Sequence, residues 1–428
     1  MLPANSADPV KNTTHKVVLP FYIYASLSFL AAAILLFISS GTLTQHYFQP
    51  DILAITHTMA LGWGTMMILG ASHQLVPVLI EGKLFSIPLA YLTFALSALG
   101  IPLLVIGFYF FNMGWPAQWG AILINAGILA YVINLALSIN RSKNENIHAV
   151  FVFTASLWLL LTTSIGLLLV YNFSLALLPN DSLHYLSLHA HIGIIGWFLL
   201  LVTGVGSRLI PMFLISKYIN TKMLWAIYVL INVGLLSFIT IFLYSPKSVF
   251  YFIPIISVFI ALILFAYYCY NSFKQRIRKH IDEQMKISML SVSMMLIPVI
   301  VLITTIGWII IHPINNQIIM LYGFTIFFGW ITAIIFGMTF KTLPFIIWNK
   351  VYHHQAGMGK TPNPKDLFNG NIFNGMGILY LLGFVLFIVG VFTGVEIILK
   401  MAALLLLIAA ILYNLNVFKL LLHKSVKT

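Results

Sequence analysis

Charged residues are scarce in this sequence of 428 residues. They make up 7% of the chain, whereas a soluble domain carries about 25%. Acidic residues are the rarest of them, with 9 aspartates and glutamates against 22 lysines and arginines. This composition excludes an ordinary soluble domain and predicts a chain that crosses a membrane many times. The basic excess is then expected to reflect membrane topology and not nucleic-acid binding.

Cysteine is almost absent too, since Cys269 is the single example. One thiol excludes a disulfide framework within the chain, a thiolate metal cluster and a Cys-x-x-Cys-His attachment of haem. Acidic side chains are missing from the middle of the long apolar runs, because Asp51, Asp181 and Glu396 stand at their ends. A proton pump needs buried carboxylates as relays, so pumping is not expected.

Apolar runs of about 20 residues, long enough to form membrane-spanning helices, occur twelve times. They cover residues 18–41, 53–80, 86–112, 118–140, 148–172, 184–213, 221–244, 249–271, 287–311, 317–348, 373–395 and 397–421. With the N-terminus in the cytoplasm, every lysine and arginine except Lys247 and Lys400 falls on the cytoplasmic side. The positive-inside rule requires this distribution. We therefore predict an all-α polytopic protein of the inner (plasma) membrane, with both termini and the loop 349–372 in the cytoplasm.

The second, sixth and tenth runs share one spaced pattern. A Gly-Trp pair is followed at constant distances by a second glycine, a polar residue and a proline. The three copies are Gly62, Trp63, Gly70, Gln74 and Pro77; Gly196, Trp197, Gly204, Arg208 and Pro211; and Gly329, Trp330, Gly337, Lys341 and Pro344. The pattern predicts three four-helix repeats, at about 18–140, 148–271 and 287–421, related by a pseudo-threefold axis normal to the membrane. We interpret the glycines as positions of close helix packing.

Histidines stand five residues before the Gly-Trp pair in two of the three copies. They are His57 and His191, and Phe324 takes this position in the third copy. An imidazole inside a membrane span is costly, so such residues are functional hypotheses. Two imidazoles at one depth on symmetry-related helices are suited to bind a single haem iron from opposite faces. The residues alone also allow core histidines bonded to backbone carbonyls, or a proton relay.

A third histidine, His189, lies two residues before His191, and hence about 160° around the helix from it. The two cannot bind one metal ion together, so His189 is expected to serve a separate site on the other side of the sixth span. His73, near the inner end of the second span, is expected to pair with local polar groups.

The run from His189 to Pro211, with its His-x-His, Gly-Trp, Gly and Leu-Ile-Pro, resembles the haem-binding helix of subunit I in haem–copper oxidases. The cbb-type oxidases and nitric oxide reductases are nearest in pattern. The stretch His57-Thr58-x-Ala60 resembles the second-helix ligand of that family, and the twelve spans resemble its three arcs of four helices. The resemblance implies a low-spin haem b held by His57 and His191. It also implies that His189 is the proximal ligand of a second haem, or binds copper.

Two features differ from that family. Its His-x-His pair lies on the tenth helix, where this chain has Phe324, and its copper B site uses an adjacent pair of histidines on the seventh helix. Residues 221–244 contain no histidine, so a complete copper B site is not expected. The chain also resembles the NnrS-type nitric-oxide-response membrane proteins, which carry a His-Ala-His span without a full oxidase site.

Together these features predict a membrane haem protein that acts in electron transfer or in the handling of nitric oxide or dioxygen. It could turn over as an oxidoreductase, although no catalytic residue is identified. Electrons would arrive from a quinol or a cytochrome. One alternative is a non-catalytic haem or nitric oxide sensor or assembly factor that uses the same histidines. Another is a histidine-dependent ion or proton transporter, which is disfavoured because transporter sites lie near the bilayer midplane.

Overall fold

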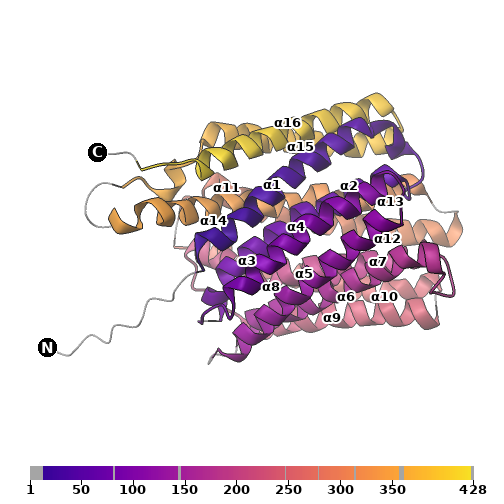
Figure 1. Ribbon diagram of the computed structural model, residues 1–428, viewed down its shortest axis with the longest axis horizontal. Helices are drawn as coiled ribbons and strands as arrows, with labels where there is room; N and C mark the ends of the chain where they lie inside the picture. Colours follow the sequence, from indigo (N-terminus) through magenta and orange to yellow (C-terminus); the bar gives the residue numbers. More distant parts are fainter. Residues whose placement is uncertain are drawn as a thin grey trace.

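The computed structural model of the chain describes residues 13–80, 82–142, 146–245, 247–277, 279–312, 315–355 and 361–425. Within these residues, twelve helical segments are long and apolar enough to cross a membrane, and each coincides with a predicted span. The helices run side by side along the long axis of the bundle (Figure 1). The first residue of α1 and the last residue of α16 lie at the same end of it (Figure 1). The predicted all-helical architecture is confirmed.

Seven spans are single uninterrupted helices, and the others consist of two or more consecutive segments. The single helices are α1 (His15–Ile38), α4 (Ile87–Tyr109), α5 (Trp115–Asn140), α6 (Ile147–Leu175), α9 (Thr221–Tyr244), α15 (Gly370–Thr393) and α16 (Glu396–Leu421). The eighth span joins a short 3-10 turn, Ser248–Tyr251, to α10 (Phe252–Lys274), and the ninth joins α11 (Glu283–Met294) to α12 (Leu296–Ile311).

The second, sixth and tenth spans each contain a π-helical segment. These spans are α2 (Pro50–His57) with α3 (Met66–Leu79), α7 (Leu186–His191) with α8 (Leu200–Leu214), and α13 (Asn316–Phe324) with α14 (Thr332–Tyr352). The π-helical segments between them are Thr58–Thr65, Ile192–Leu199 and Thr325–Ile331. Each begins directly after the position of His57, His191 or Phe324. The wider π turn is frequent at functional sites, and it changes which residues share a face. Periodicity at a constant angle per residue does not predict it.

These three spans are also the most deeply buried of the twelve. The other spans surround them: α4 packs on α5, α9 on α10 and α15 on α16, and α1 packs on both α3 and α16. Contacts between α5 and α6 join the first four spans to the next four. The contact between the first helix and the last closes the bundle around the three inner spans.

The glycines of the repeated pattern lie where inner spans touch outer ones. A Cβ atom at Gly70 would lie 2.7 Å from Cβ of Phe21 on α1, and one at Gly204 would lie 2.3 Å from Cβ of Phe151 on α6. A Cβ at Gly337 would collide in the same way with α11. Because no side chain fits at these points, the helix backbones approach closely. These contacts agree with the interpretation of the glycines as packing positions.

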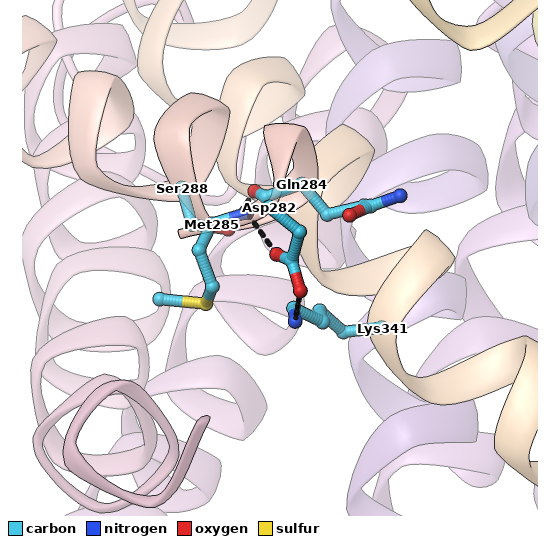
Figure 2. A network of polar contacts seen from close by, with 5 residues as sticks. All are labelled: Asp282, Gln284, Met285, Ser288 and Lys341. Carbon is cyan, nitrogen blue, oxygen red and sulfur yellow. Dashed lines mark hydrogen bonds and ion pairs between the residues drawn. The ribbon is translucent and has the colours of Figure 1, made fainter. Parts of the chain in front are cut away.

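An ion pair fixes the start of α11 to α14. Asp282 caps α11, where its Oδ1 accepts a hydrogen bond of 3.2 Å from the backbone N–H of Met285. Its Oδ2 pairs with Nζ of Lys341, which stands at the polar position of the third copy of the pattern (Figure 2). The two side chains are 27% and 11% exposed, respectively. The polar position therefore stabilises an interface in this part of the molecule.

Candidate cofactor site

A cavity of about 320 Å³ lies among the inner spans and their neighbours. Leucine, isoleucine and phenylalanine side chains form most of its wall, and His57 and His189 are the two histidines in it. Cofactor and ligand sites are usually largely apolar cavities of about 300–1,000 Å³ with a small number of placed polar groups. The cavity has this character, at the lower end of that range.

His57 and His189 face one another in this cavity. Their ring centroids lie 6.3 Å apart, and the two ring planes are inclined by 18°. His57 ends α2 and His189 lies in α7, so the second and sixth spans supply one imidazole each. Phe108 of α4 contacts the His57 ring, with 4.6 Å between the centroids. The second and sixth spans thus bring two imidazoles with nearly parallel ring planes into one cavity.

Backbone carbonyls fix the orientation of both rings. Nδ1 of His57 lies 2.8 Å from the carbonyl oxygen of Leu53, and Nδ1 of His189 lies 3.1 Å from that of Thr162 on α6. A carbonyl oxygen only accepts hydrogen bonds, so each Nδ1 carries the hydrogen and Nε2 is the basic nitrogen of the neutral ring. Histidines that bind metal ions are commonly held in this way by a bond from their other nitrogen.

The separation of the rings fits one metal ion between them. A bond from a metal to an imidazole nitrogen measures about 2 Å, and the nitrogen lies roughly 1 Å from the ring centre. Two imidazoles on opposite sides of one ion therefore place their centroids roughly 6 Å apart. The observed 6.3 Å agrees with this value. Neutral imidazoles in an apolar wall are also the usual donors to haem iron.

His191 lies on the other side of the sixth span, outside the wall of this cavity. Its Nδ1 is 2.7 Å from the carbonyl oxygen of Ser187. Its ring lies 4.9 Å from that of Phe238 and 5.7 Å from that of Tyr322, with 24° between the planes of His191 and Tyr322. The geometry thus pairs His57 with His189 and not, as predicted, with His191. The prediction that His189 and His191 serve opposite faces agrees with these positions.

The repeated pattern explains the pairing. Tyr322 holds the position in the third copy that His189 holds in the second, so His191 with Tyr322 repeats the relation of His57 with His189. Residues related by rotation about an axis occupy equivalent places and do not face each other. At the third such place Phe324 stacks on Phe387, with 3.5 Å between their centroids.

Tyr322 is a residue that sequence reasoning missed, because tyrosine is common in membrane spans and its spacing alone is no signal. His73 lies apart from the cavity and stacks on Phe21, with 5.3 Å between the ring centroids, while its Nδ1 donates to the carbonyl of Leu69. Nδ1 of His73 therefore has the expected local partner, whereas its Nε2 is buried with no hydrogen-bond partner among the described residues. Among the described residues, no group of three or more His, Cys, Asp or Glu side chains could hold a metal ion.

The described residues form a bundle of membrane-spanning helices with two facing histidines, and this chain can be compared with known proteins. No family model matches the sequence, and no curated protein matches it. A solved structure does match in three dimensions, a haem–copper terminal oxidase dimer determined by cryo-EM. The TM-score is 0.71 with 11% sequence identity, over 96% of this chain and 84% of that one. The chain therefore has the fold of a haem–copper terminal oxidase.

Proposed function

We propose that His57 and His189 bind one haem b and that the protein acts in one-electron transfer within the membrane. The observation that carries this proposal is the facing pair of imidazoles, 6.3 Å apart in an apolar cavity. The fold likeness supports it, because the similar structure is that of a haem–copper oxidase. When bound, haem supplies a redox-active iron whose potential depends on its axial ligands and on the polarity around it.

The residues of this chain would orient the group and keep water from it. The carbonyls of Leu53 and Thr162 hold the two rings with Nε2 available. The apolar wall would surround a bound haem and lower the local dielectric, which would change the redox potential of its iron. If both imidazoles bound one haem iron, that iron would have two protein ligands, so the site would suit electron transfer better than gas binding at the same iron.

Handling of nitric oxide or dioxygen would require a second group. With His189 committed to the first group, His191 is the residue left for a second haem or a copper ion. Its Nδ1 is held by the Ser187 carbonyl in the same way as that of His57 by Leu53. Consumption of nitric oxide or dioxygen by the purified protein, with a reduced quinol or cytochrome as electron donor, would establish an enzyme. Haem binding without turnover would favour a carrier or sensor.

We also propose that the protein lies in the inner membrane with both termini in the cytoplasm. The charge distribution supports this orientation, since Lys247 and Lys400 are the exceptions among all lysines and arginines. Reporter fusions test it: a fluorescent protein at the C-terminus should be bright, and a periplasmic phosphatase at the same place should be inactive. A dark fluorescent fusion with an active phosphatase fusion would show that the C-terminus lies outside the cytoplasm.

The haem proposal is tested by a reduced-minus-oxidised visible spectrum of protein purified from haem-replete cells. We expect a sharp b-type α-band in the wild type and its loss in both His57→Ala and His189→Ala. His354→Ala is the matched control, because His354 is exposed in the 3-10 turn after α14 and its loss should leave the band unchanged. Metal analysis of the same samples separates haem iron from copper. A folded wild type without iron would refute haem binding, and stoichiometric copper lost in both variants would assign the pair to copper.

A further inference from the structure

A second cavity of about 100 Å³ lies among the second, sixth and tenth spans. Most of its wall comes from equivalent positions of the three copies of the repeated pattern, and Tyr22, Val76, Leu79 and Val152 complete it. The equivalent sets are Met67, Leu201 and Ile334; Ile68, Val202 and Ile335; Ala71, Val205 and Met338; Ser72, Gly206 and Thr339; and Leu75, Leu209 and Thr342. A hollow lined by all three members of each set lies on the pseudo-threefold axis. We call it the axial cavity.

The axial cavity is distinct from the cavity that contains His57 and His189. Phe198 and Phe327 line the histidine cavity and do not line the axial one. Their rings meet edge to face, with 6.0 Å between the centroids, and Phe198 stands one helical turn before Leu201. Phe198 also fills the space over Gly64, where an added Cβ would lie 2.7 Å from the phenyl ring. Aromatic side chains thus lie at the edge of the histidine cavity, next to the first axial residues.

The hydroxyl groups of the axial wall already donate to protein atoms. Ser72 donates to the carbonyl of Leu69 at 3.1 Å, and Thr339 donates to Sδ of Met67 at 3.9 Å. Thr342 donates to the carbonyl of Met338 at 2.9 Å. Since that bond uses the Thr342 hydrogen, the 3.0 Å bond between Tyr22 and Thr342 has Tyr22 as its donor.

Almost no polar surface faces the cavity, and this decides what it can hold. A buried water molecule needs two to four polar partners, and apolar cavities without them stay dry. The rest of the axial wall consists of carbon side chains and methionine. A dry apolar cavity of about 150 Å³ binds xenon or benzene in another protein. The axial cavity is smaller, so it favours a smaller apolar guest.

We propose that the axial cavity is a binding site for one small apolar gas molecule, with dioxygen or nitric oxide as the natural class of ligand. The use of this site rests on the gas handling that a second group at His191 would supply, whereas gas binding in the cavity itself requires no cofactor. Burial of an apolar guest in a preformed dry cavity is favourable because dispersion contacts replace empty space.

Xenon is the probe that tests this site. We expect a crystal of the full-length protein under xenon pressure to show one xenon atom on the axis, beside Ala71 and Val205. Ala71→Leu fills the cavity and should abolish that peak. Ala95→Leu is the control, because Ala95 is exposed on α4 and the same added atoms lie away from the cavity. Val205→Ile is a milder change that should reduce xenon occupancy if Ala71→Leu fails to fold.

Ordered water in the axial cavity, or xenon bound in the histidine cavity alone, would overturn the proposal. So would an axial xenon peak of equal height in folded Ala71→Leu protein. These outcomes are separable from failure of the haem proposal, because xenon binding does not depend on colour. Axial xenon in a colourless protein would support the axial binding site and refute haem binding. A b-type spectrum without axial xenon would support haem binding and refute the axial site.

Discussion

Trp197 donates its indole N–H to Oγ1 of Thr65, 3.0 Å away across the interface of the sixth and second spans. Trp63 donates in the same way to Thr332, at 3.1 Å, from the second span to the tenth. Each acceptor stands two residues after the tryptophan of its own copy of the pattern, so the bonds follow one direction around the axis. Leu199 holds the third acceptor position and has no hydroxyl. The interface of the sixth and tenth spans therefore differs chemically from the other two.

Replacing the acceptor should destabilise the inner bundle. Thr65→Val keeps the shape of the side chain and removes the oxygen that accepts from Trp197. The indole of Trp197 is buried, with 1% of its surface exposed, and a buried donor without a partner costs about 1–3 kcal/mol. We expect a lower unfolding temperature in detergent for Thr65→Val.

The control for this substitution is Thr304→Val. The Thr304 hydroxyl donates within its own exposed helix face, to the carbonyl of Ile300 at 2.9 Å. Its loss should leave the unfolding temperature close to that of the wild type. An equal shift in both variants would show that the bond between the spans contributes nothing specific.

Replacement of His191 distinguishes the observed pairing from the one predicted by the repeat. His191→Ala should retain the b-type α-band that His57→Ala and His189→Ala lose, because the His191 ring contacts Phe238 and Tyr322 and is not itself part of the cavity wall. The measurement is haem content per protein by the pyridine haemochrome method. Loss of half of the haem would indicate a second haem at His191. Complete loss would contradict the pairing of His57 with His189.

Close approach of α8 and α6 predicts a severe effect of one methyl group. Gly204→Ala would place a Cβ 2.3 Å from Cβ of Phe151, and overpacking of this kind costs about 1–3 kcal/mol. We expect a lower unfolding temperature and lower yield. Gly307→Ala is the matched control, because no atom lies within 4 Å of the added Cβ there. A tolerated Gly204→Ala would show that the two helices separate easily.

The ion pair between Asp282 and Lys341 predicts non-additive effects. Lys341→Met removes the cation, and Asp282→Asn removes the charge while retaining a side chain that caps α11. Each change should destabilise by roughly 1–3 kcal/mol, since a charged group loses a partner in a largely buried place. The double variant should be less destabilised than the sum of the two, because it leaves no opposed charge. Additive unfolding temperatures would show that the pair is not coupled.

Several features follow from the sequence without any tertiary information. The lengths of the apolar runs determine the twelve spans, because a helix that crosses the hydrocarbon core must satisfy its own backbone and be about 20 residues long. The constant spacing of the Gly-Trp pattern identifies the three spans that hold equivalent places in the repeats. The same spacing places His57 and His191 at equivalent positions, and the two-residue step puts His189 on the opposite face of the helix from His191.

Only the tertiary structure decides which side chains meet. The residue equivalent to His57 on the sixth span is His191, and residues related by the threefold rotation do not face one another. The ring of His57 instead faces His189, which stands two residues before His191. The π-helical segments are equally hidden from sequence, because a pattern read at a constant angle per residue does not predict the wider turn. The axial cavity also depends on tertiary structure, because three spans whose equivalent residues are more than 130 positions apart meet at one axis to form its wall. Spacing along the chain determines which residues share a face of one helix, whereas packing between helices determines which side chains form the site.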